Sequence, residues 1–216
     1  QGRSQETDWQ MIEVQQGTEQ WFAARLGRAS ASMFHAILAK GRGKTESVVR
    51  KRYRDQIVQE RLTGKRIEIE TNPAMERGVR LEPVARNLYW LKTGRKPKEA
   101  GVYLHPELMA AASPDGLLPD NGGLEIKCPG DKSHTDYLNL PPFTPPERYA
   151  PQVQGQMWLA GFDYVDFVSY NPDFPDEQQF VCRRIHRDNE YIAMLESEVS
   201  RFLLEVDADI HNFLGK

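Results

Sequence analysis

The chain has 216 residues, of which 39% are hydrophobic and 27% are charged, enough for one large domain with its own core. No apolar run approaches the roughly 20 residues of a membrane span, and the polar start QGRSQETDWQ lacks the apolar stretch of a signal peptide. Two cysteines are too few for a disulfide scaffold. We therefore expect a single soluble, intracellular domain over residues 1–216, with a flexible start over residues 1–10.

The net charge of −3 is unevenly distributed along the chain. Residues 40–66 hold ten Lys or Arg but only three Asp or Glu, so this segment carries +7 while the remainder carries −10. A basic run of this kind is usually a solvated helix face. If the acidic remainder binds metal, the same run also fits a track for nucleic-acid phosphates.

The first 94 residues are patterned as helices. Each predicted helix follows a residue whose side chain can accept a hydrogen bond from the first turn, and each ends at a glycine. The candidate caps are Thr18, Ser30 or Ser32, Thr45 and Asn72, and the helices cover residues 19–27, 33–41, 46–64 and 74–94. Because the fourth contains Pro83, which lacks the N–H that a helix needs, we expect a kink or a new helical start there.

The middle of the chain changes to a two-residue period. GVYLH and LMAAASPDG, within residues 101–116, read as short strands, and GLEIKCP alternates apolar with charged residues over 123–129. The intervening PDNGG contains Asn-Gly, a strong signal for a tight hairpin turn. The strands on either side of this turn should therefore pair.

The last third returns to mixed elements. A helix is predicted over residues 147–161, followed by two strands over 164–172 and 178–187. Asp188 can cap a long final helix whose apolar face holds Ile192, Leu195, Val199, Phe202 and Leu203. The order of elements indicates an α/β layered domain with a mixed sheet.

Three charged side chains stand out in SPDGLLPDNGGLEIKCP, residues 113–129. Pairing of the strands brings Asp115 and Glu125 to the same end of the hairpin, where two carboxylates repel unless a cation lies between them. Mg²⁺ prefers carboxylate, carbonyl, water and phosphate oxygens. Lys127, on the same strand face as Glu125, can orient a water or stabilise charge developing on a phosphate. Each part alone is common, since an acid and a base at this spacing usually form a solvated pair.

Together, the order Pro-Asp, hairpin, Glu-x-Lys resembles the signature of the PD-(D/E)XK nuclease superfamily. RLGRASAS, SPDGL, GLEIKCP and APQVQGQMWLAG also resemble, in the same order, the phage lambda exonuclease and YqaJ-type viral recombinase family, over about residues 21–170. This resemblance implies a restriction-endonuclease-like layered core with a mixed central β-sheet flanked by helices. It also implies a magnesium-dependent exonuclease that degrades the 5′-ended strand of duplex DNA processively.

The resemblance assigns catalytic roles residue by residue. It implies two Mg²⁺ ions in each active site, with Mn²⁺ able to substitute. The implied metal ligands are Asp115, Glu125, Glu82 and the backbone carbonyl of Ile126, and the catalytic set adds Lys127 and Gln152. Pro83 directly follows Glu82, so the geometry of that helix is left open.

The resemblance also implies a pocket for the terminal 5′ phosphate. Arg25, Ser32 and Ser113 match its residues, and Arg suits the role because its planar fork binds phosphate oxygens in pairs. Where the family has a further arginine, this chain reads GDKSH, so Lys132 is the substitute. With DNA as the substrate, the basic run is expected to contact the backbone through Arg42, Lys44, Arg50, Lys51 and Arg54.

The same family implies double-stranded DNA ends, a homotrimer and a single-strand annealing protein as partners, with no membrane. It places the chain in the cytoplasm of a bacterial host, encoded by a phage or prophage. Two alternatives stay open: an endonuclease on the same core, which Arg25 and Ser32 disfavour, and a catalytically silent nucleic-acid-binding module. The five histidines are expected to be structural, and His134 is the one whose role is left open.

Overall fold

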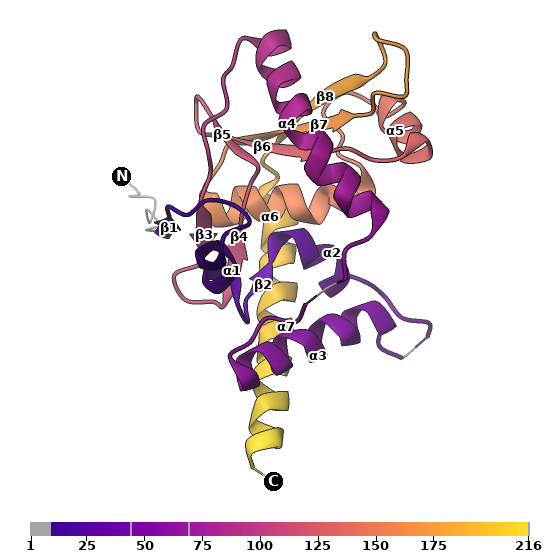
Figure 1. Ribbon diagram of the computed structural model, residues 1–216. Coiled ribbons are helices and arrows are strands. Elements are labelled where there is room, and N and C mark those ends of the chain that lie inside the picture. Colours follow the sequence, from indigo (N-terminus) through magenta and orange to yellow (C-terminus); the bar gives the residue numbers. More distant parts are fainter. Residues whose placement is uncertain (1–9, 44, 69, 216) are drawn as a thin grey trace, which may run out of the picture.

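Two four-stranded mixed sheets with helices packed on them form the part of the chain described by this computed structural model, residues 10–43, 45–68 and 70–215 (Figure 1). Most of the predicted flexible start, residues 1–9, lies outside the described residues, as does Lys44. The first sheet, in spatial order, holds β1 Gln10–Ile12, β3 Val102–Leu104, β4 Ala110–Ala112 and β2 Ala29–Ser30. The second holds β5 Gly116–Leu118, β6 Gly122–Lys127, β7 Tyr164–Tyr170 and β8 Phe180–His186.

Both sheets contain parallel and antiparallel pairs. In the second sheet β5 and β8 run antiparallel to their neighbours, whereas β6 and β7 are parallel. The predicted hairpin is present, since β5 pairs with β6 and sets Gly116 opposite Leu124. Its turn residues Asp120 and Asn121 adopt φ angles of 58° and 57°, as a type I′ turn requires. The predicted fold class is confirmed, although the strands divide into two sheets where one was expected.

The helices agree with the sequence best where a capping side chain marks the start. Thr18, Asn72 and Asp188 each accept a hydrogen bond from the first turn of the helix that follows. Among the described residues, no helix combines the length and the apolarity required to cross a bilayer. The helices are α1 Glu19–Arg25, α2 Phe34–Ile37, α3 Val48–Thr63, α4 Pro73–Thr93, α5 Asp131–Leu138, α6 Ala150–Ala160 and α7 Asn189–Leu214, with 3₁₀ turns η1 Ala31–Met33 and η2 Glu147–Tyr149.

Three predicted helix features differ from the structure. The second helix is a 3₁₀ turn followed by one turn of α-helix, far shorter than predicted, and the third begins after Ser47 rather than Thr45. α4 continues through Pro83, so the predicted new start is wrong. Pro83 leaves the Val79 carbonyl without its helical donor, but both residues are exposed, so water can bind that carbonyl.

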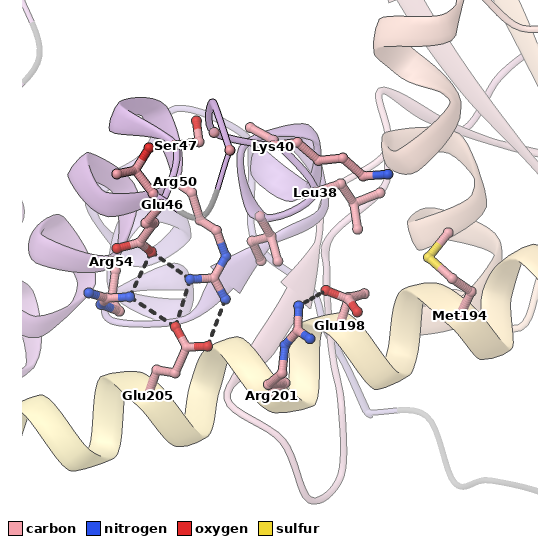
Figure 2. A pocket seen from close by; sticks show the side chains of 15 residues that line it. Leu38, Lys40, Glu46, Ser47, Arg50, Arg54, Met194, Glu198, Arg201 and Glu205 are labelled. Atoms are coloured by element: carbon pink, nitrogen blue, oxygen red, sulfur yellow. Dashed lines mark hydrogen bonds and ion pairs between the residues drawn. The ribbon is translucent and has the colours of Figure 1, made fainter.

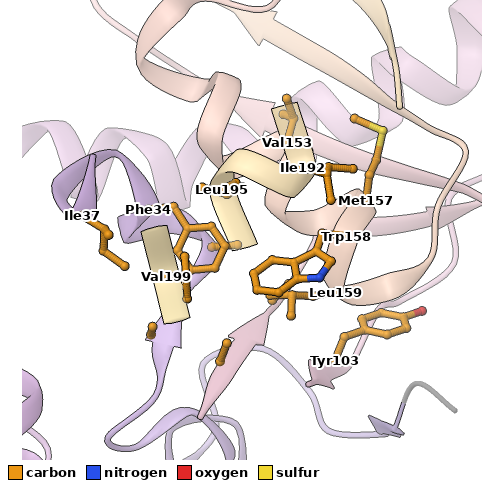
Figure 3. Packing of buried hydrophobic residues seen from close by; sticks show 14 of the residues in the cluster. Phe34, Ile37, Tyr103, Val153, Met157, Trp158, Leu159, Ile192, Leu195 and Val199 are labelled. Atoms are coloured by element: carbon orange, nitrogen blue, oxygen red, sulfur yellow. The ribbon is translucent and has the colours of Figure 1, made fainter. Parts of the chain in front are cut away.

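The two faces of the second sheet are covered by different helices. Leu124 and Ile126 pack with Ala85 and Tyr89 of α4, while Glu125 points toward α6 on the other face. α6 is buried along nearly its whole length, and Val153, Met157 and Trp158 pack with Phe34 and with Leu195 and Val199 of α7 (Figure 3). The predicted apolar face of α7 is confirmed, because Ile192, Leu195, Val199, Phe202 and Leu203 are all buried. Each such side chain contributes about 1.5–3 kcal/mol, which fixes α6 beneath the sheet.

Candidate active site

Asp115 lies at the entrance of the hairpin and is tied to β6 through backbone groups. Its amide N–H donates to the Leu124 carbonyl at 2.9 Å, and its Oδ2 accepts from the Ile126 N–H at 2.7 Å. These bonds extend the hairpin by one residue beyond β5. The structure thus brings Asp115 beside the strand that carries Glu125 and Lys127.

Glu125 is a buried carboxylate, with 1% of the residue exposed. Its Oε1 accepts from Gln152 Nε2 at 2.6 Å and lies 2.5 Å from Lys127 Nζ, and its Oε2 accepts from Gln156 Nε2 at 2.6 Å. The charge is therefore compensated by one ammonium and two amide donors. The ammonium of Lys127 also lies 4.9 Å from the centre of the Tyr149 ring.

The electrostatics of this cluster disfavour a second negative charge beside Glu125. Burial raises the pKa of Asp115 well above its usual range, and the charges of Glu125 and Glu82 raise it further. Burial alone would lower the pKa of Lys127, but Glu125 and Asp115 hold it above its usual range. A cation bound between the carboxyl groups would favour the ionised form of Asp115.

Glu82 reaches the cluster from α4 together with an arginine that the sequence analysis did not single out. Arg86, one turn after Glu82, places Nη2 3.3 Å from Glu82 Oε1 and donates from the same nitrogen to the Asp115 carbonyl. Gly116 leaves space for this guanidinium, since a Cβ there would lie 3.1 Å from Arg86 Nη1 and 3.1 Å from Pro97 Cβ. Arg86 therefore joins the helix-borne acid to the hairpin.

The donor chemistry of the cluster fits Mg²⁺. Among the described residues, no three His, Cys, Asp or Glu side chains are gathered closely enough to hold a metal ion by themselves. Mg²⁺ does not need such a cage, because it is usually bound through one or two carboxylates, with waters and substrate phosphates completing its shell. Asp115, Glu125 and Glu82 supply hard oxygen donors of this kind.

Arg25 stands beside the carboxylate cluster in a pocket of its own. Its Nη2 donates to Ser30 Oγ at 2.6 Å and lies 3.4 Å from Ser32 Oγ, and its guanidinium stacks 4.0 Å from the centre of the Trp21 ring. Burial lowers the pKa of Arg25, while Tyr53 and Glu125 oppose that shift, so the arginine lies within the field of the Glu125 carboxylate. The adjoining cavity has a volume of about 480 Å³ and is lined in part by Trp21, Arg25, Ser30, Ser32, Tyr53 and Met75.

Ser113 reaches the same end of the first sheet from another strand. β2 and β4 are parallel, with Ser30 opposite Ala111, so Ser32 and Ser113 each follow that pair by two residues. Ser113 Oγ is buried and has no hydrogen-bond partner within the described part of the chain. Such an unpaired hydroxyl suits a group that receives a ligand. Lys132, by contrast, lies exposed in the first turn of α5.

A family model for the YqaJ-like viral recombinase domain matches residues 20–163. The chain belongs to this family. LHK-Exo, an alkaline exonuclease from Laribacter hongkongensis, is 41% identical, covers 91% of this chain and 96% of its own, and superposes with a TM-score of 0.81. Its complex with dAMP gives 42% identity and a TM-score of 0.82 over the same coverage. The family resemblance seen in the sequence is confirmed.

A more distant structure shares the fold. A phage-related exonuclease from Haemophilus somnus 129PT is 20% identical, with a TM-score of 0.67 over 86% of this chain and 96% of its own. No curated protein matches the chain significantly.

The basic segment of this YqaJ-like chain is arranged differently from the expected phosphate track. Arg50 forms ion pairs with Glu46 and Glu205, both at 2.6 Å, and is 9% exposed (Figure 2). Arg54 contacts Glu46 at 2.7 Å, Glu205 at 2.9 Å and Asp209 at 2.9 Å. These two side chains therefore point toward α7 and not into solvent. Arg42 and Lys51 are exposed, and Lys51 pairs with its helical neighbour Asp55 at 2.7 Å.

His134 has a structural environment. Its ring is fully buried, with Nδ1 2.8 Å from Ser169 Oγ and Nε2 2.8 Å from the Gln178 carbonyl. Because a carbonyl only accepts, Nε2 must carry a proton, and the histidine then ties α5 to β7 and to the loop before β8. This geometry agrees with the expectation that the histidines are structural.

Sequence reasoning missed four residues of the YqaJ-like site: Ser30, Arg86, Tyr149 and Gln156. Each was only weakly indicated by the sequence: its spacing from a predicted site residue would place both on the same face of a helix or strand. Arg86 lies four residues after Glu82, and Gln156 lies four after Gln152. Spacing of this kind selects many side chains in any helix, so only the packing identifies which of them face the site.

Proposed function

We propose that the chain is a magnesium-dependent exonuclease that degrades the 5′-ended strand of linear duplex DNA and leaves a 3′ single-stranded overhang. The observation that carries this proposal is the juxtaposition of the Asp115–Glu125–Lys127 cluster with the Arg25 pocket in a YqaJ-like fold. LHK-Exo, with which the chain shares 41% identity, is an exonuclease, and its structure has been determined with dAMP.

Asp115, Glu125 and Glu82 are the residues that would hold two Mg²⁺ ions, with the Ile126 carbonyl as a further ligand, and Mn²⁺ would substitute. When bound, the ions supply Lewis acidity and lower the pKa of water so that it can attack a phosphodiester. Water adds to the phosphorus that joins the first two nucleotides, and the bond from this phosphorus to the 3′ oxygen of the terminal nucleotide breaks. That oxygen takes up a proton, so the terminal nucleotide departs as a 5′-mononucleotide and the remaining strand keeps a new 5′ phosphate. The chain's own residues orient this reaction: Gln152 holds Glu125, and the charged Lys127 stabilises negative charge on the phosphate.

The pocket around Arg25 accounts for strand direction in this proposal. A terminal 5′ phosphate carries more charge than an internal one, and a guanidinium flanked by hydroxyls binds it preferentially. Ser30 and Ser32 supply those hydroxyls beside Arg25, and Ser113 would add a third from the neighbouring strand. Since Ser113 lies two residues before Asp115, the phosphate grip and the metal site share one strand end.

The wider setting is proposed from the family alone. A homotrimer would enclose the DNA, a single-strand annealing protein would take up the 3′ strand, and the complex would act in the cytoplasm of a bacterial host carrying the phage gene. Of the described residues expected to contact the DNA backbone, Arg42 and Lys51 are exposed.

The test compares linear and covalently closed duplex DNA of the same sequence in Mg²⁺, with EDTA as the zero-rate control. We expect the linear form alone to disappear, with release of 5′-mononucleotides. Nicking of the closed circle would instead identify an endonuclease, and binding without hydrolysis a silent module. A Lys127→Met protein purified in parallel reveals any contaminating nuclease.

A further inference from the structure

α6 presents a stripe of polar side chains to the active site although the helix is otherwise embedded in the core. Tyr149, Gln152 and Gln156 follow one another at three- and four-residue spacing, which places them on one face. All three meet the Glu-x-Lys motif: Tyr149 faces Lys127, and both amides donate to Glu125. The stripe therefore contacts the two charged residues of β6 from below.

We propose that Gln156 is a positioning residue that holds Glu125 in the orientation in which it binds metal. This inference rests on the proposed function. An ionised carboxylate offers about four lone-pair positions. Gln152 and Lys127 occupy the two on Oε1, and Gln156 occupies one on Oε2. One lone-pair position, on Oε2, therefore remains free for a metal ion. The hydrogen bond from Gln156 sets the direction of that lone pair.

The amide of Gln156 is retained at a cost to the fold. Its Oε1 is buried and has no hydrogen-bond partner in the described part of the chain. An unpaired buried acceptor costs about 1–3 kcal/mol, which a methionine of similar length would avoid. Stability alone therefore does not explain an amide at this position, whereas the hydrogen bond from its N–H to Glu125 does.

The backbone that carries Gln156 is fixed by its neighbours. Gly155 lets α6 pack directly on Phe34, since a Cβ there would lie 2.6 Å from the ring of Phe34. Met157 and Trp158, which follow, are buried in the main core (Figure 3). The amide donor is therefore held on a rigid element, and Glu125 cannot shift without losing its hydrogen bond.

Gln154 provides a matched control on the same helix. It is 5% exposed, against 1% for Gln156, and unlike Gln156 it uses both ends of its amide. Its Nε2 donates to the His186 carbonyl at 3.0 Å and its Oε1 accepts from the Asp188 N–H at 3.0 Å, on the side of α6 away from Glu125. A Gln154→Met variant therefore damages packing and hydrogen bonding without touching the site.

The experiment titrates Mn²⁺ into the DNA-free protein and follows free ion by electron paramagnetic resonance, and separately measures the Mg²⁺ concentration for half-maximal DNA degradation. We expect Gln156→Met to weaken Mn²⁺ binding about 10- to 100-fold and to raise the Mg²⁺ requirement in parallel, as loss of a group that orients a metal ligand does. Gln154→Met should leave both values near wild type, although it lowers the melting temperature. Gln156→Asn, which keeps the amide but cannot reach Glu125, should repeat the loss even if the methionine variant fails to fold.

Unchanged Mn²⁺ binding in a folded Gln156 variant would overturn the inference, as would an equal loss in Gln154→Met. The two proposals fail separately. If the wild type degrades DNA while the Gln156 variants bind Mn²⁺ normally, only the positioning role is lost. If Mn²⁺ binding depends on Gln156 but the wild type hydrolyses no DNA, only the proposed function is lost.

Discussion

The hairpin cluster and the contact between α3 and α7 both gather acidic and basic side chains, but the pKa values of their carboxyl groups shift in opposite directions. In the hairpin, burial and the charges of Glu125 and Glu82 raise the pKa of Asp115. Between α3 and α7, hydrogen bonding to Arg50 lowers the pKa of Glu205. A buried carboxyl group whose charged form is disfavoured is typical of binding and catalytic sites, whereas one whose charged form is stabilised by arginines is typical of an ion-paired contact between helices.

A large effect in this comparison is expected from Lys127→Met, which removes the single ammonium of the hairpin. Hydrolysis should slow by about a hundredfold to a thousandfold, because charge on the phosphate loses its stabilising partner. Metal binding should survive, since no proposed ligand is removed. Single-turnover rates together with Mn²⁺ titration separate the effect on hydrolysis from the effect on metal binding. Loss of Mn²⁺ binding with an unchanged rate at saturating metal would contradict the role assigned to Lys127.

A second effect concerns the phosphate pocket. Arg25→Ala should reduce the preference for 5′-phosphorylated over 5′-hydroxyl duplex by about tenfold to a hundredfold, the worth of charge-assisted hydrogen bonds. Arg201→Ala, which removes the same charge from an exposed position on α7, is the control. Rates on the two substrates are compared for all three proteins, and a full phosphate preference in Arg25→Ala would remove this residue from the pocket.

The same comparison explains what the sequence could predict. The hairpin was predictable because its partners are close along the chain and its Asn-Gly turn fixes their register: Asp115 bonds to Ile126 only 11 residues away. The role of Arg50 was not predictable, because its partner Glu205 lies 155 residues away in the sequence. A count of local charge over residues 40–66 cannot include acids that the fold brings from α7.

The ion pairs between α3 and α7 predict a difference between two pairs of substitutions. Arg50→Gln with Arg54→Gln should destabilise the protein by about 1–3 kcal/mol, because Glu205 and its acidic neighbours lose their partners. Lys51→Gln with Arg52→Gln removes the same charge from exposed positions of the same helix and should leave stability nearly unchanged. Urea denaturation measures the difference in stability.

The substitution of Lys51 and Arg52 by Gln also tests contact with DNA. If Lys51 touches phosphate, the affinity of this variant for DNA should depend less on salt concentration than that of the wild type.

The smallest effect is in the acid dependence of stability. The lowered pKa of Glu205 means that its ionised form is stabilised by folding, so its contribution is complete above the ordinary value of 4.5 and is lost as pH falls through the lowered pKa. Glu205→Gln should therefore lose less stability than the wild type on acidification below that value. The melting temperatures of both proteins, measured as a function of pH, test this expectation. If the two melting temperatures fell in parallel with pH, the ion pair would not contribute to stability.

The central claim is that the hairpin cluster is the hydrolytic centre, and Asp115→Asn tests it most directly. The measurement is the release of nucleotides from 5′-phosphorylated linear duplex in Mg²⁺, alongside melting temperature and DNA binding. We predict a loss on the order of a thousandfold or more, since a shared metal ligand disappears. The melting temperature should stay equal or rise, because a neutral amide relieves the burial and repulsion that raise the pKa of Asp115. A folded, DNA-binding Asp115→Asn protein that still releases nucleotides at a rate near wild type would contradict the account.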